Sequence, residues 1–411
     1  MYRRIGQVVL LVVGLFCASC RAPQDEALDS VATATSSDRR YLEDTWLPLE
    51  QGPWGNLEYR RFFLPMPEAW LAGAPMTEAT IWHVPGISPD ETSTAINASL
   101  LTAKEKELWQ QTCRLEPEGD GSVIHPSKEF RWALEPASRA KLYLWLAQFP
   151  QNPTLAFPFC YSTADSSDWM HESNLPPELL ASIRQLIYPA DSSLCFADLD
   201  LIEDKIVSRE QRVELLGILY RHPYCDIRLH INVTTDLSAL SHYWGEAYRT
   251  EKVKRTLQAA LGKKTEAYIS LTQLFPYLPR TLVNTYPAVT TNRAKPQPDC
   301  YWTTFNFFNI KPDDRFFDNA FMEEALTKHH ERVQGKARYG DILFLVDSTG
   351  RPFHSAIYLA ADFVFTKNGG HFTQPWVIMK LTDLKACYPQ ARPVRETYYR
   401  WSPVKSRPAS S

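Results

Sequence analysis

Two residues near the C-terminus, Cys300 and His354, have the chemistry of a nucleophile and its base. A thiol attacks only as thiolate, so it needs a setting that lowers its pKa and a partner that accepts its proton. Asp299 is a residue type that caps helices, so Cys300 is expected in the first turn of a helix, where the dipole stabilises negative charge. His354 lies in a strand-like segment and would supply the base.

The segments around this pair predict the elements that would position it. Residues 295–298, Lys-Pro-Gln-Pro, are stiff and extended, and the expected helix begins directly after them. Beyond residue 335 the pattern changes to period two, with turn residues between apolar runs. Strands are therefore predicted over 341–346, 354–359, 363–366, 376–381 and 394–401.

Three motifs in this order resemble those of the NlpC-type papain-like cysteine peptidases, which are bacterial cell-wall endopeptidases and amidases. They are Asp299-Cys300, the Gly-Asp-Ile-Leu-Phe of residues 340–344 and the His-Ser-Ala-Ile-Tyr-Leu of residues 354–359, within the last third of the chain. The resemblance implies an α+β fold, with a papain-like domain after a mainly helical N-terminal domain. In the papain-like domain the helix bearing the cysteine packs on an antiparallel sheet.

The resemblance also implies roles for single residues. Cys300 would be the nucleophile, and His354 would take its proton and later return it to the leaving amine. Tyr286 would lie near the oxyanion site, with the backbone N–H of Cys300 as the second donor. The chain departs from the family directly after the cysteine, where Tyr301-Trp302 replace a small Ser-Gly pair.

A third polar residue, from the next strand, orients the imidazole in this family. Thr366 falls nearest the usual position, and Asn368 would lie on the same strand face. Asn368 is favoured because its amide oxygen can accept the ring N–H, and His371 is a further alternative.

The N-terminus resembles a bacterial lipoprotein signal. Arg3 and Arg4 precede an apolar stretch, residues 8–16, that is too short to span a bilayer. The stretch ends in Cys-Ala-Ser-Cys at residues 17–20, which resembles a lipobox and implies cleavage before Cys20 and lipidation of its thiol; an ordinary secretory signal is the alternative. Because Arg21 follows instead of Asp, the family rule implies an outer-membrane anchor facing the periplasm.

Composition and patterning define the predicted domains. The chain has 411 residues, is 44% hydrophobic and has a formal net charge of −3, so neither a nucleic-acid partner nor a broad electrostatic attraction to an anionic surface is indicated. We predict a signal peptide over 1–20, a flexible tether over 21–45, a mixed, mainly helical domain over 46–280 and the NlpC-like domain over 281–405. The sequence carries no indication of an oligomeric state.

Six of the eight cysteines lie beyond the predicted signal and its lipobox: Cys113, Cys160, Cys195, Cys225, Cys300 and Cys387. They contain no C-x-x-C pair and no zinc-like spacing, so no metal or cofactor is expected. In an oxidising compartment, disulfides are plausible among the first four of them, and the sequence leaves the pairing open.

These features predict two alternative functions, which belong to different classes of protein. The first is a lipid-anchored hydrolase of the cell envelope that cleaves amide bonds in peptidoglycan stem peptides. The second is a catalytically inactive binding or scaffold lipoprotein built on a decayed peptidase domain. The Tyr301-Trp302 departure and the large front domain motivate the second.

Overall fold

The computed structural model describes residues 40–42, 45–74, 76–163, 169–170, 173–288, 296–388 and 394–402. Within them the chain is a mixed α/β protein whose sheets are antiparallel, which is compatible with the predicted α+β class. The predicted signal and its Cys20 lie outside the described residues. No helix in the described part of the chain is long and apolar enough to cross a membrane.

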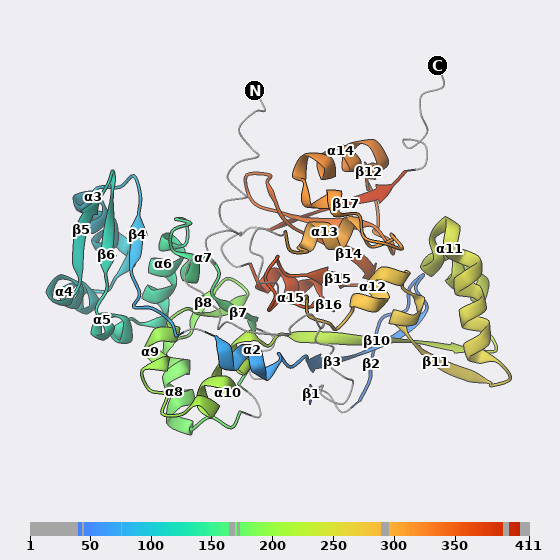
Figure 1. Cartoon of the computed structure of the whole chain (residues 1–411), viewed down its shortest axis with the longest axis horizontal. Helices are drawn as coiled ribbons and strands as arrows, with labels where there is room; N and C mark the ends of the chain where they lie inside the picture. The colour runs from blue at the N-terminus through green and yellow to red at the C-terminus, as the bar shows by residue number, and fades with distance from the viewer. Residues whose placement is uncertain are drawn as a thin grey trace, which may run out of the picture. The chain divides into compact units, whose positions relative to one another are not determined.

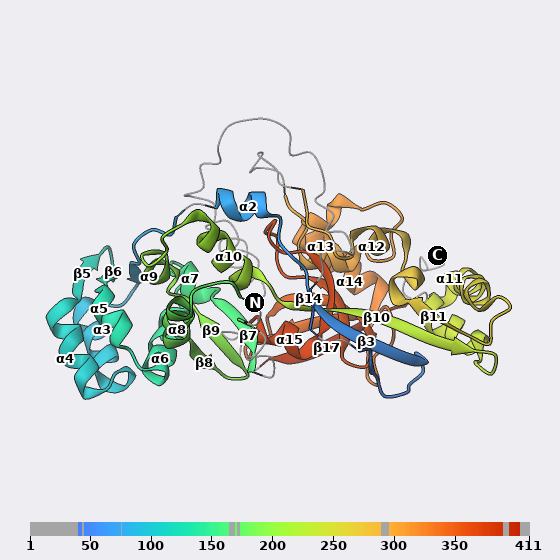
Figure 2. The ribbon, with the colours of Figure 1, turned by 90° about the horizontal axis from the view of Figure 1, so that it is seen from below.

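The described chain divides into two compact units. The first consists of residues 66–221 and 385–388, and the second of residues 40–65, 222–384 and 394–402. This division differs from the predicted boundary near residue 280. The physical reason is that strand β3 (Asn56–Phe63) pairs along its length with β10 (Pro223–Asn232), so that segments far apart in the sequence belong to one sheet (Figure 2).

The first unit contains two three-stranded sheets, with strand orders β4-β6-β5 and β7-β9-β8. Its strands are β4 (Trp82–Val84), β5 (Arg114–Glu118), β6 (Gly121–His125), β7 (Phe159–Ser162), β8 (Tyr188–Ala190) and β9 (Ser193–Phe196). Its helices are α2 (Glu68–Gly73), α3 (Pro89–Ala95), η3 (Ile96–Leu100), α4 (Ala103–Thr112), α5 (Lys128–Ala133), α6 (Pro136–Leu146), α7 (Pro153–Ala156), α8 (Pro177–Leu186), α9 (Leu199–Glu203) and α10 (Arg209–Tyr220). The start of α4 is fixed by a reciprocal pair of hydrogen bonds between Thr102 and Glu105.

The second unit contains a six-stranded sheet, with the order β12-β17-β13-β14-β15-β16, and a smaller sheet around β3 and β10. The six strands are β12 (His330–Arg332), β13 (Ile342–Val346), β14 (Pro352–Ala360), β15 (Phe363–Lys367), β16 (Trp376–Lys380) and β17 (Arg395–Trp401). The smaller sheet adds β1 (Arg40–Tyr41), β2 (Leu47–Pro48) and β11 (Glu266–Ser270). Five of the six strands lie within two residues of their predicted bounds, whereas β12 was not predicted; β1 occupies part of the predicted tether.

Helices cover these sheets (Figure 1). They are α11 (Leu237–Leu261), η5 (Leu271–Leu274), α12 (Tyr277–Leu282), α13 (Cys300–Phe305), η6 (Asp314–Phe317), α14 (Asn319–His329) and α15 (Leu381–Ala386), whose last residues belong to the first unit. The short helix α13 packs against β14 and β15. It therefore brings Cys300 to the middle of the six-stranded sheet.

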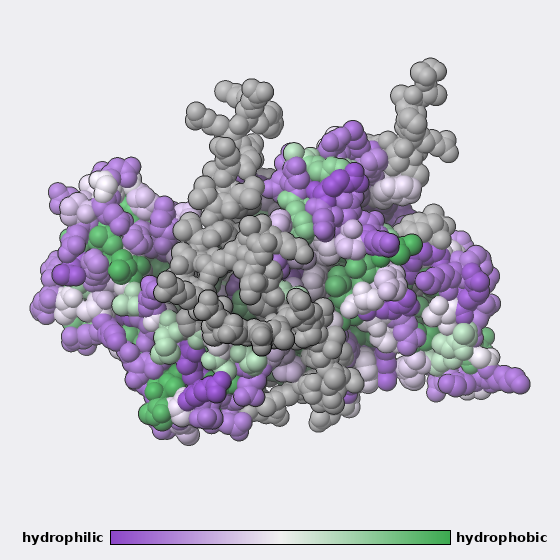
Figure 3. Space-filling model, in the orientation of Figure 1, coloured by the Kyte–Doolittle hydropathy of each residue, from purple (hydrophilic) through white to green (hydrophobic). Residues whose placement is uncertain are grey.

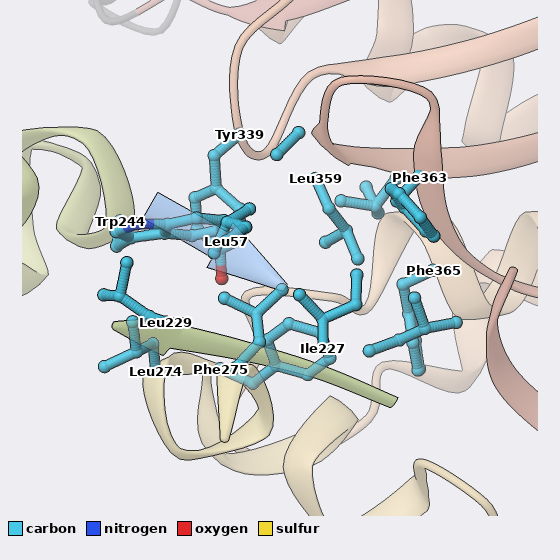
Figure 4. Close-up of a cluster of buried hydrophobic side chains, with 14 of the residues drawn as sticks. Leu57, Ile227, Leu229, Trp244, Leu274, Phe275, Tyr339, Leu359, Phe363 and Phe365 are labelled. Carbon is cyan, nitrogen blue, oxygen red and sulfur yellow. The ribbon is translucent and has the colours of Figure 1, made fainter. Parts of the chain in front are cut away.

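One hydrophobic core holds the second unit together (Figure 4). Leu57 and Ile227 from the smaller sheet share it with Phe365 from the larger sheet, Trp244 from α11 and Trp302 from α13. Each of these side chains is at most 5% exposed. The core therefore requires both sheets, which is why residues 281–405 do not form a unit alone. The described surface shown in Figure 3 is mostly hydrophilic, with apolar side chains in small groups.

Candidate functional site

Cys300 is the first residue of α13, as predicted from the capping residue before it. The Asp299 carboxylate accepts a hydrogen bond from the Trp302 N–H at 2.8 Å, which fixes the start of the helix. The Trp376 indole donates to Thr303 Oγ1 at 2.9 Å and ties the helix to β16. The predicted position of the thiol at a helix start is therefore confirmed.

The Cys300 thiol lies against Ser355 of β14. The backbone and the side chain of Ser355 both act to lower the pKa of this thiol. The thiol is 5% exposed, and this burial, with the nearby charge of Asp299, raises the pKa of Cys300 to about 12. Like the polar groups of Ser355, the charge of Lys367 acts to lower the pKa of Cys300. The resting state at neutral pH is therefore a neutral thiol.

Lys367 is the buried cation of this site, and sequence reasoning missed it. It has no exposed surface, and its amino group donates to the carbonyls of Gly369 and His371 at 2.5 and 3.0 Å. Burial lowers the pKa of Lys367 to about 7, while Asp299 and Cys300 act to raise it. The group is therefore divided between ammonium and free amine near neutral pH. The missed signal was strand alternation, which puts residue 367 on the same face as Phe365, a core residue.

His354 contacts Thr366 and not Cys300. Its Nε2 lies 2.8 Å from Thr366 Oγ1, and the Thr366 hydroxyl also lies 3.3 Å from the Ser355 carbonyl. Neighbouring residues of a strand point to opposite faces, so His354 is directed away from the face on which Ser355 meets Cys300 and Thr304. Within the described residues, no hydrogen bond joins Cys300 to His354. The predicted dyad is not assembled in this structure.

The alternatives for a third residue occupy different places. Thr366, at the usual family position, is the residue against the His354 ring. The favoured Asn368 lies two residues further along that face, where its amide donates to the Met379 sulfur at 3.6 Å. His371 contacts Thr373 Oγ1 through Nδ1 at 2.7 Å, and burial lowers its pKa to about 4.

Tyr286, the predicted oxyanion residue, is 2% exposed and donates its hydroxyl proton to the Leu64 carbonyl at 3.3 Å. Burial raises its pKa. A phenol has one proton to donate, so in this conformation that proton is directed to Leu64 rather than to a reacting carbonyl. No group of three potential metal ligands occurs among the described residues.

No family model, curated protein or solved structure matches this chain. Asp299, Ser355 and Lys367 all influence the Cys300 thiol on the face of the sheet that α13 covers, Lys367 through its charge. Within the described residues, no hydrogen bond joins the Lys367 amine to the thiol; it donates to the Gly369 and His371 carbonyls.

The buried His354 predicts an acid-sensitive fold. Burial lowers the pKa of His354 to about 3, below the ordinary 6.5, so between these values the unfolded chain binds a proton that the folded chain does not. Stability from His354 is complete above pH 6.5 and is lost at about 1.4 kcal/mol per pH unit as the pH falls toward 3. Urea unfolding from pH 7 to 4 should show a shallower pH slope for His354→Gln than for the wild type. His242→Gln, on the exposed side of α11, is the matched control, and equal slopes for wild type and His354→Gln would contradict the prediction.

Proposed function

We propose that the chain is a cysteine hydrolase of the cell envelope that cleaves amide bonds, with Cys300 as the nucleophile. The observation that supports it is the electrostatic interaction of this thiol, in the first turn of α13, with the buried amine of Lys367. A nucleophile needs a base that is unprotonated near the working pH, and a lysine with a pKa of about 7 meets that condition. The lipid anchor at Cys20, the papain-like arrangement and peptidoglycan stem peptides as substrate belong to the same proposal, and the sequence motifs support them.

In this mechanism Lys367 is the general base, the role that the family resemblance implies for His354. The free amine accepts the thiol proton as sulfur attacks the carbonyl carbon, and the resulting ammonium returns the proton to the leaving amine. Ser355 lies against the sulfur, and the backbone N–H of Cys300 is the proposed donor to the developing oxyanion. Water then attacks the thioester, which releases the acid and restores the thiol. His354 and Thr366 join β14 to β15 within the core.

A second candidate is a binding or scaffold lipoprotein without hydrolase activity. It is supported by the 5% exposure of Cys300 and by the position of His354 on the other face of the sheet. Under this alternative the thiol, with its pKa of about 12, is a core residue that packs against Ser355.

The pH dependence of Cys300 alkylation by iodoacetamide distinguishes the two candidates. In the mature chain without its lipid anchor, the hydrolase proposal expects the rate to rise through about pH 7, as Lys367 loses its proton. This rise should disappear in Lys367→Met and persist in His354→Gln. A rate that rises only toward about pH 12 and does not depend on Lys367 supports the scaffold. Loss of the rise in His354→Gln alone would restore the histidine as the base.

A further inference from the structure

Two cysteines of the first unit lie opposite each other in a small sheet. Cys160 of β7 and Cys195 of β9 are directly paired in the antiparallel register. Their sulfurs are 2.8 Å apart, closer than the roughly 3.5 Å at which non-bonded heavy atoms pack. The side chains are 2% and 0% exposed, within a core that also contains Tyr143 and Tyr188.

We propose that Cys160 and Cys195 form a disulfide in the mature protein, which covalently joins β7 to β9. Residues directly opposite on antiparallel strands have Cα atoms about 4.5–5.5 Å apart, a separation that a disulfide spans without backbone movement. The sequence left several pairings open. The structure selects this one, because Cys225 belongs to the other unit and the Cys113 sulfur lies 3.9 Å from the Thr112 hydroxyl.

The oxidation requires an acceptor, and a small-molecule or protein disulfide is the class that fits. One cysteine thiolate attacks the acceptor disulfide, which forms a mixed disulfide and releases one thiol. The second cysteine then displaces the remaining half, so two protein thiols are oxidised and one acceptor disulfide is reduced to two thiols. Since both sulfurs are buried in the folded sheet, the exchange is expected while β7 and β9 are still assembling.

The bond would stabilise the first unit by restricting its unfolded chain. It closes a loop with a sequence separation of 35 residues, and this loop contains α8 and β8. Loops of this size give substantial chain-entropy stabilisation. We therefore expect the melting temperature of the oxidised chain to exceed that of the reduced chain by about 5–10 °C. The inference is independent of the hydrolase proposal, which concerns Cys300 in the second unit.

Peptide mapping under non-reducing conditions tests the pairing. The mature chain without its lipid anchor is reduced, refolded with glutathione disulfide and digested with trypsin. The expected product is one disulfide-linked pair, residues 142–184 with residues 185–205, because Lys141, Arg184 and Lys205 bound these peptides. Four of the six thiols should remain titratable.

Variants connect the bond to stability. The 5–10 °C difference between oxidised and reduced protein should persist in Cys113→Ser and disappear in the double variant Cys160→Ser/Cys195→Ser. The wild-type comparison needs no variant, so poor folding of the double variant would not obscure the result. Recovery of the two peptides unlinked, titration of all six thiols, or a link from Cys160 to another cysteine would overturn the proposal.

Discussion

Replacing Lys367 with methionine is expected to lower kcat for hydrolysis of isolated peptidoglycan stem peptides by about 10²–10⁴-fold, the usual contribution of a general base. Methionine keeps an unbranched apolar chain in the same buried space but cannot accept a proton. Cys300→Ala should abolish turnover altogether. The wild-type kcat/KM should rise with pH through about 7, because the free amine is the active form of Lys367. Product formation is measured by chromatography across this pH range.

Lys380→Met is the matched control for this prediction. Lys380 lies on the adjacent strand β16, where its amino group donates to the Tyr59 hydroxyl at 2.9 Å. It is not part of the Cys300 group, so kcat should remain near the wild-type value. His354→Gln should also retain activity. If His354→Gln is inactive while Lys367→Met is active, Lys367 is not the base. If the wild type is inactive on every stem peptide, the scaffold candidate is favoured.

Local signals in the sequence were sufficient for the elements of the site. Period-two patterns and turn residues located the five strands β13 to β17, because side chains of a strand alternate between faces. The short edge strand β12 was not predicted. Asp299 located the start of α13, because its carboxylate satisfies a free backbone N–H. These features depend on residues close together in the chain, so no knowledge of the tertiary fold was required.

The side chain of β14 that meets the Cys300 thiol could not be predicted from such local signals. Which face of β14 each residue occupies depends on the register, and a shift by one residue exchanges the two faces. β14 has an irregularity just before the histidine: Leu345 pairs with His354 but Val346 pairs with Pro352, which leaves Phe353 as an extra residue. A motif alone therefore identified the strand but not the side chain, Ser355, that meets the thiol.

The domain boundary depended on long-range pairing as well. β3 and β10 join in one sheet although residues 66–221 of the first unit lie between them in the sequence. Each strand is compatible with several partners by pattern alone, and the choice is made by the shared core around Leu57, Ile227 and Phe365. The local patterns between residues 102 and 220, where the chain forms both helices and the strands β5 to β9, carried no information about this sheet.

The largest stability effect is expected at a buried charge cluster in the first unit, which neither composition nor motifs indicated. Asp198 accepts hydrogen bonds from Arg139, from Arg131 Nη1 at 3.2 Å and from the Tyr143 hydroxyl at 2.6 Å. Arg131 is also paired with Asp200. Arg139 and Asp198 are 0% and 2% exposed, so the cost of removing their charges from water must be compensated by contacts within the protein. Arg139 also donates to the Arg131 carbonyl at 2.6 Å, but Asp198 is its carboxylate partner.

Asp198→Ala should therefore lower the free energy of unfolding by about 3–5 kcal/mol, because it leaves the buried Arg139 guanidinium without a carboxylate. Urea unfolding of the mature chain, followed by tryptophan fluorescence, measures the change. Asp204→Ala is the control: Asp204 pairs with Lys128 at the surface, both side chains are more than half exposed, and such pairs contribute less than about 1 kcal/mol. Since Arg131 retains Asp200, the difference between the two variants reports mainly on Arg139. Equal, small losses for both would mean that Arg139 reaches water in the native state, and the cluster would then not be a closed buried network.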